Sequence, residues 1–180
     1  MIRVAFFKAS HGELDDKVID FGSGNIGYSH CEYMTSEYST IGAHYKDNIV
    51  EERYYNNLLS DPRWVVLEIN YDEVIPEKNM VAAIGTKYDT AGVVCKFIGL
   101  NACINDEKTW CSKVIAESLN HVNINIMPNE LFTYLKEAGG SIISNVASNE
   151  VIPKVDKTNK LGRITREEFL ELMKNKGLKK

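Results

Sequence analysis

The chain contains 180 residues with a mass of 20.3 kDa, of which 44% are hydrophobic and 26% are charged. This length suits one domain, and the apolar share excludes wholesale disorder. No apolar run reaches the roughly 18 residues of a membrane helix, and the first residues lack the apolar core and cleavage site of a signal peptide. We therefore expect a cytoplasmic protein without a membrane span, whose cysteines at 31, 95, 103 and 111 are reduced.

The net charge of −4 is distributed unevenly along the chain. Residues 154–180 carry nine Lys or Arg and four Asp or Glu, a formal charge of +5, which leaves −9 for the remainder. An acidic body excludes a nucleic-acid binder that uses its whole surface. Residues 149–180 are expected to form a basic linker and a helix that begins near Thr165. This tail either docks on the acidic body or is displayed to an anionic partner.

The first half of the chain favours strands. Short apolar or alternating runs predict them at residues 2–7, 28–35, 37–45 and 65–71. Between the first two, residues 14–21 suit a short helix or turn. Residues 72–84 are expected to start as a helix that Pro76 interrupts.

The second half favours helices. Residues 88–100 are apolar enough for a buried helix, and residues 110–120 follow with Thr109 as the expected N-cap. A third helix is expected over 128–138, because Pro suits its first position and two glycines end it. Together the two halves predict an α+β fold, an antiparallel sheet packed by helices.

Cys111 is the strongest candidate nucleophile. It falls in the first turn of the helix expected over 110–120, where the backbone N–H groups and the helix dipole stabilise a thiolate. The alternative is a buried structural cysteine.

A nucleophilic cysteine needs a base, which is most often histidine. His30 and Glu32 are two positions apart on an expected strand and therefore share one face. His44 lies on the next expected strand, about 4.8 Å away, from which it can reach an imidazole. Each histidine is otherwise a surface residue or a satisfied core residue.

Several short motifs occur in an order that resembles a known family. They are YSHCE at 28–32, WVVL at 64–67, GTKYDTAG at 85–92, WCSKVI at 110–115 and MPNEL at 127–131. This order is similar to that of the circularly permuted papain-like amidases and peptidases, relatives of the NlpC-type cell-wall hydrolases. In that family a strand carries Y-S-H-x-E, a later segment Y-D-x-x-G, and a helix begins C-S-E. The resemblance covers residues 1 to about 140.

The resemblance implies a permuted papain-like catalytic domain over residues 1–148, with residues 149–180 outside it. Cys111 matches the nucleophile and His30 the general base, and permutation explains why the histidine precedes the cysteine. The third, orienting residue is either His44, by its place on the following strand, or Glu32, by its charge and its place in the motif. No metal or cofactor is expected.

Two further positions bear on the chemistry. Tyr88 matches a tyrosine that lies near the nucleophile in relatives, where its hydroxyl would help to bind the oxyanion; packing in the core is the alternative. Lys113 stands where the family usually has Glu, and its ammonium either lowers the pKa of the thiol or faces solvent.

The implied reaction is cleavage of an amide in a peptide, an isopeptide or a cell-wall peptide through an acyl-enzyme intermediate. The alternatives are a lipid-directed acyltransferase or thioesterase, and an inactive binding module of the same fold. Members of this group occur in bacteria and their viruses, so a viral protein would act in the host cytoplasm.

Overall fold

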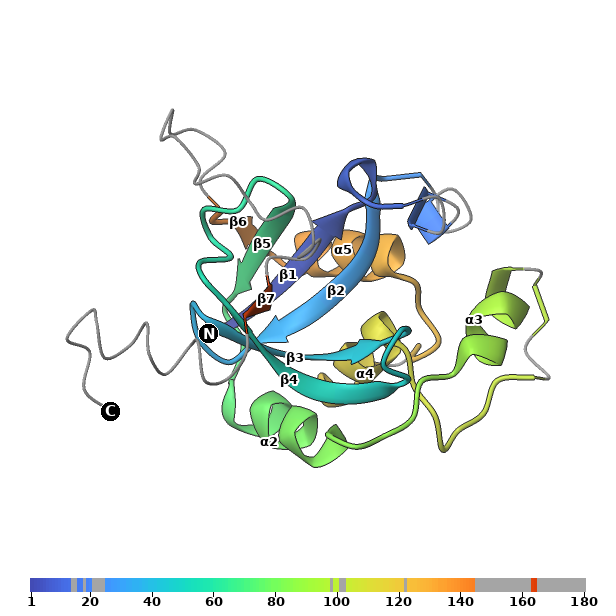
Figure 1. Cartoon of the computed structure of the whole chain (residues 1–180). Helices are drawn as coiled ribbons and strands as arrows, with labels where there is room; N and C mark the ends of the chain where they lie inside the picture. Colours follow the sequence, from blue (N-terminus) through green and yellow to red (C-terminus); the bar gives the residue numbers. More distant parts are fainter. Residues whose placement is uncertain are drawn as a thin grey trace.

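The computed structural model describes residues 1–13, 16, 17, 19, 20, 25–97, 99, 100, 103–121, 123–144, 163 and 164. These residues form an α+β fold, in which one antiparallel sheet carries helices packed across it (Figure 1). The strand order is β6-β5-β1-β2-β3-β4-β7, and every neighbouring pair is antiparallel. The expected fold class is thus confirmed, while the papain-like topology stays a prediction.

The strands include all four that the sequence predicts. Their bounds are β1 (Ile2–Lys8), β2 (Tyr28–Met34), β3 (Ser39–His44), β4 (Ile49–Tyr55), β5 (Trp64–Ile69), β6 (Ser141–Ile142) and β7 (Arg163–Ile164). The sequence did not predict β4, because the adjacent Glu51, Glu52 and Arg53 break the apolar alternation that marks a strand. The β-ladder with β3 holds these charged residues in the sheet.

The helices differ from the expected ones mainly at their ends. Their bounds are η1 (Ala9–His11), α2 (Val74–Ala83), α3 (Thr90–Phe97), α4 (Cys111–Ser118) and α5 (Pro128–Glu137). Pro76 does not interrupt α2, because it lies in the first turn, where a missing N–H costs no intrahelical bond. The helix expected over 88–100 is shorter, and Val94 on it is exposed. The N-cap of α4 is Trp110 and not Thr109.

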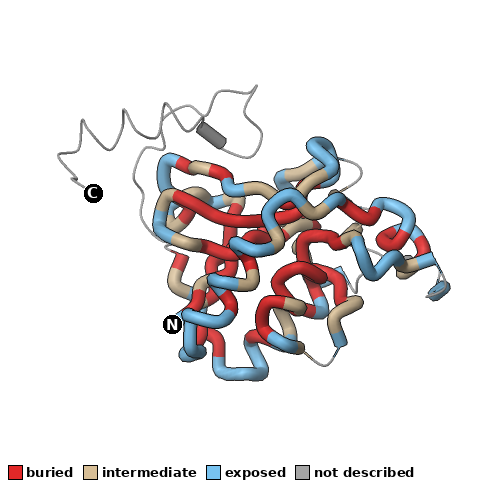
Figure 2. Tube along the Cα trace, turned by 90° about the horizontal axis from the view of Figure 1, so that it is seen from below, coloured by how far each residue is buried: buried red, intermediate tan, exposed pale blue. Residues whose placement is uncertain are grey.

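Both faces of the sheet are covered. The larger core joins residues of β1, β2, β3 and β5 to apolar residues of α2, α4 and α5. A smaller core on the other face gathers Phe7, Tyr55, Leu58 and Trp64. Figure 2 shows the buried residues, in red, gathered toward the middle of the molecule, with pale blue exposed residues mostly around its edge.

The ladder between β2 and β3 is short. Its paired residues are Tyr33 with Ile41 and Met34 with Thr40, although both strands run further toward His30 and His44. Helix α4 packs against both strands. Cys111, the first residue of that helix, hydrogen-bonds to Cys31 of β2 and so lies beside this strand.

Two expectations about the cysteines and the tail change. Cys95 and Cys103 form a disulfide, so the expectation of four reduced cysteines is wrong for this pair, while Cys31 and Cys111 are free thiols. The linker expected over 149–162 and the helix expected from Thr165 lie outside the described residues. Between them, β7 pairs with Tyr54 and Tyr55 at the sheet edge.

Within the described part of the chain, no helix has the length and apolar character needed to cross a bilayer.

Candidate active site

The N-terminus of α4 is fixed by hydrogen bonds to the loop before α5. The indole N–H of Trp110 and the hydroxyl of Ser112 both donate to the carbonyl of Ile126, at 2.9 and 2.6 Å. Cys111 lies between them as the first residue of the helix, with 4% of its surface exposed. At this position the N–H groups of the first turn have no intrahelical acceptor and favour a negative charge.

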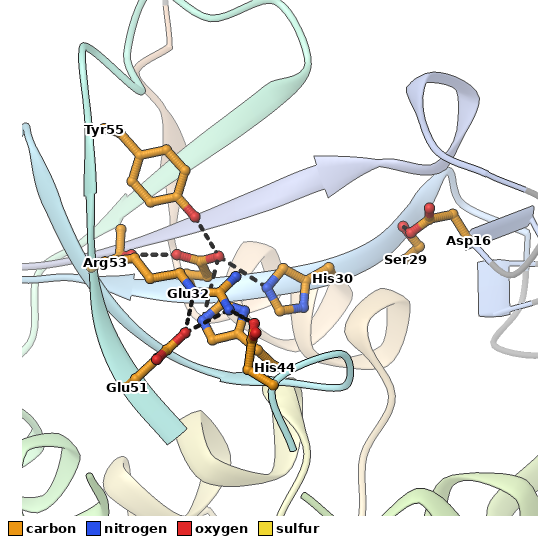
Figure 3. Close-up of polar contacts among 10 residues, drawn as sticks. Asp16, Ser29, His30, Glu32, His44, Glu51, Arg53 and Tyr55 are labelled. Atoms are coloured by element: carbon orange, nitrogen blue, oxygen red, sulfur yellow. Dashed lines mark hydrogen bonds and ion pairs between the residues drawn. The ribbon is translucent and has the colours of Figure 1, made fainter. Parts of the chain in front are cut away.

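His30 and Glu32 project from the same face of β2, as their spacing predicts. His30 Nε2 donates to Glu32 Oε1 at 3.0 Å (Figure 3). The His30 side chain is 16% exposed, whereas that of Glu32 is fully buried. Because Nε2 is engaged by the carboxylate, Nδ1 is the ring nitrogen that remains for proton exchange with a thiol.

The Glu32 carboxylate is held by hydroxyl donors from two other strands. Tyr55, on β4, donates to Glu32 Oε1 at 2.7 Å, and Thr40, on β3, donates to Oε2. Figure 3 shows Tyr55, His30 and His44 arranged around this carboxylate. Burial raises the pKa of Glu32, but the charge of His44 and the hydrogen bond from His30 hold it well below its usual range. The group is therefore a carboxylate at neutral pH.

The thiol and the imidazole are coupled. Burial lowers the pKa of His30, but hydrogen bonds and charges of Cys111 and Glu32 raise it to about 9. The pKa of Cys111 is well below its usual value, because hydrogen bonds from the Cys31 side chain and from His30 outweigh the effect of burial. These directions describe a thiolate and an imidazolium side by side, which is the reactive form of a cysteine nucleophile.

Cys31 contacts the candidate nucleophile Cys111, which the sequence did not predict. It points to the helix side of β2, opposite His30, as the alternation of a strand requires. Its side chain and its backbone both hydrogen-bond to Cys111. Burial raises the pKa of Cys31 well above its usual value, so it stays a neutral thiol and can donate to the thiolate.

Glu32 and His44, the two candidates for the orienting residue, both lie close to His30. Glu32 accepts a hydrogen bond from His30 at 3.0 Å, whereas His44 Nε2 lies 3.9 Å from the same carboxylate oxygen. The two imidazole rings are 5.1 Å apart. Gly42 makes this packing possible, because a Cβ there would lie 2.9 Å from Glu32 Cγ and 3.3 Å from His44 Nε2.

Tyr88 lies near the nucleophile and is 7% exposed. Burial and the charge of Cys111 raise the pKa of Tyr88 well above its usual value, so its hydroxyl keeps its proton. The next residue, Asp89, has a structural role. Its carboxylate accepts hydrogen bonds from the backbone N–H groups of Gly92 and Asn105, both at 2.9 Å. This carboxylate fills the space that a side chain at Gly92 would occupy.

Lys113 does not face solvent. It is fully buried, and its ammonium donates to the carbonyls of Lys108 and Asn105 at 2.8 and 3.1 Å. It also lies over the Trp110 ring, 5.3 Å from the centroid. The ammonium thus anchors the loop that leads into α4.

Among the described residues, one group could hold a metal ion. The ligating atoms of His30, Glu32 and His44 all lie within 4.8 Å of one another. The sequence did not predict a metal site here.

Comparison of the chain with known protein families, curated proteins and solved structures finds no match.

Proposed function

We propose that this protein is a thiol hydrolase of the permuted papain-like type, with Cys111 as nucleophile, His30 as general base and acid, and Glu32 as the orienting residue. The observation that supports it most is the arrangement itself. Cys111 begins α4, His30 faces it, and the far nitrogen of that imidazole is bonded to a buried carboxylate at 3.0 Å. A nucleophile, a base and a group that orients the base are the parts that acyl transfer needs.

The reaction begins with the thiolate of Cys111. Its sulfur attacks the carbonyl carbon of an amide, and the carbonyl π electrons move to oxygen. The N–H of Cys111 and the Tyr88 hydroxyl are the proposed donors to that oxyanion. As the tetrahedral intermediate collapses, His30 gives its Nδ1 proton to the leaving nitrogen, and the C–N bond breaks.

In the hydrolysis of the acyl-enzyme, His30 acts as a base and no longer as an acid. Neutral His30 takes a proton from water, the hydroxide adds to the thioester, and the C–S bond breaks to release the acid. Throughout, Glu32 accepts the hydrogen bond from the Nε2–H group and keeps the ring in the tautomer and orientation that present Nδ1 to sulfur.

The substrate proposed here is a peptide, isopeptide or cell-wall peptide, as the motif order suggests. The test is release of the amine from labelled peptides and cell-wall fragments, with acyl thioesters and acyl lipids assayed in parallel. Cys111→Ser should abolish turnover and leave the fold intact, because the change is nearly isosteric. Activity of Cys111→Ser within tenfold of the parent would refute the nucleophile.

A matched pair of histidine variants tests the base. His30→Ala should lose a factor on the order of 10²–10⁴ in rate, as removal of a general base does. His11→Ala, which removes an exposed histidine on η1, should keep the parent rate. Equal rates for the two variants would contradict the assignment of His30.

A further inference from the structure

Three ligating atoms converge beside the proposed nucleophile. His30 Nε2 and His44 Nε2 lie 3.0 and 3.9 Å from Glu32 Oε1, and all three atoms fall within 4.8 Å of one another. Four-coordinate zinc with bonds of about 2.0–2.2 Å separates its ligand atoms by roughly 3.3–3.6 Å. The two distances to the carboxylate oxygen bracket this range, and the ligating nitrogens of the two imidazoles, which lie within 4.8 Å of each other, complete the set.

The donor set is one that zinc prefers. Two imidazole nitrogens and one carboxylate oxygen occupy three positions of a tetrahedral zinc site and leave the fourth for water or a substrate atom. Calcium and magnesium prefer all-oxygen sites, so a nitrogen-rich set selects against them.

The carboxylate already has the outer contacts of a metal ligand. The hydroxyls of Tyr55 and Thr40 hold its two oxygens, and Gly42 leaves the room in which Glu32 and His44 approach each other. Such outer hydrogen bonds fix a ligand's direction and strengthen metal binding. Figure 3 shows His30, Glu32 and His44, which come from β2 and β3, close together, with the Tyr55 hydroxyl pointing to the carboxylate.

The charges around the cluster suit a dication. The Glu32 side chain, an acidic group, is fully buried at the centre of the cluster. The nearby Arg53 guanidinium is bonded to the carboxylates of Asp47 and Glu51, which neutralise it.

We propose that His30, Glu32 and His44 form a zinc site whose occupancy switches off the thiol hydrolase. Each imidazole gives a nitrogen lone pair to the metal, and any proton on that nitrogen passes to solvent. Glu32 then bonds to zinc and no longer to the Nε2 proton of His30. The inhibition rests on the proposed function, because a metal-bound His30 cannot carry the proton that the leaving group needs. Zinc binding by the three side chains does not depend on that function.

Binding is measured on the untagged full-length Cys111→Ser protein, by titration of Zn²⁺ against a competing chelator. One zinc per chain is expected. His44→Ala, made in the same background, should weaken binding at least tenfold, whereas His11→Ala removes an exposed histidine and should bind as the parent does. Tyr55→Phe keeps the core shape and removes one outer hydrogen bond, so it should cost about 10–100-fold in affinity.

Cobalt substitution separates this site from the simplest alternative, zinc held by the thiolate and His30. In the protein with Cys111 intact, Co²⁺ should give visible absorption of a nitrogen and oxygen site without a sulfur-to-metal charge-transfer band. A charge-transfer band that Cys111→Ser removes, or zinc affinity unchanged by His44→Ala, would overturn the proposal. Zinc binding without any hydrolase activity in the metal-free protein would support the metal site and refute the proposed function instead.

Discussion

Replacing Glu32 with Gln removes one buried negative charge and nearly preserves the shape of the side chain. The wild-type carboxylate lies 3.0 Å from His30 Nε2 and accepts hydroxyl hydrogen bonds from Tyr55 and Thr40. An opposite charge at such a distance changes a pKa by about 1–3. The pKa of His30, about 9 in the wild type, is therefore expected to fall to about 6–8 in the variant.

The thiol responds in the opposite direction. With less imidazolium beside it, Cys111 holds its proton more firmly, so its pKa rises. At pH values below that pKa, each rise of one in the pKa leaves about tenfold less thiolate. The midpoint of Cys111 alkylation by iodoacetamide as a function of pH, followed by peptide mass spectrometry, should therefore move to higher pH in the variant. Hydrolysis should slow by a factor on the order of 10²–10⁴, or roughly 3–5 kcal/mol of barrier.

The control is Glu68→Gln, which removes a carboxylate that pairs with Arg3 elsewhere in the sheet. It should leave the alkylation profile unchanged, and circular dichroism should show that both variants keep the fold. A Glu32→Gln profile of alkylation against pH that superimposes on the wild-type profile would refute the orienting role.

Three further outcomes are expected. Gly42→Ala should lower the melting temperature by roughly 2–12 °C, because a Cβ there overpacks Glu32 and His44 at a cost of about 1–3 kcal/mol; an unchanged thermal transition would contradict that packing. The buried Glu32 carboxylate has a pKa below that of the unfolded chain, so it contributes stability above about pH 4.3 that is lost as pH falls; acid unfolding of Glu32→Gln should then depend less steeply on pH, and parallel curves would count against this. Truncation after Asn149 removes β7 and should lower the melting temperature by a few degrees while Cys111 stays reactive; unchanged stability with a loss of salt-dependent binding to an anionic polymer would instead mark the tail as a targeting element.

The residues closest to the proposed chemistry followed from local spacing. A two-residue separation on a strand places His30 and Glu32 on one face, and a cysteine in the first turn of a helix meets the positive end of its dipole. Both rules depend only on neighbours in the chain. For this reason the shared face of His30 and Glu32, and the place of Cys111 in the first turn of α4, could be predicted without knowing how the sheet is ordered.

The supporting residues could not be found in this way, because they come from distant segments. Tyr55 reaches Glu32 from β4, a strand whose charged residues conceal it in the sequence. The hydrogen bonds of Cys31 to the nucleophile depend on how α4 packs against β2, which spacing does not determine. The Cys95–Cys103 disulfide likewise has no metal or redox spacing that would predict it.

The most direct test of the central claim is competitive alkylation of the two free thiols in the native wild-type protein. Limiting iodoacetamide at pH 6 is followed by quantification of modified Cys111 and Cys31 peptides, with the disulfide intact. Both thiols are buried, but only Cys111 has a lowered pKa, so Cys111 should be labelled in clear preference to Cys31. Equal labelling of the two thiols, or preferential labelling of Cys31, would contradict the assignment of Cys111 as an activated nucleophile.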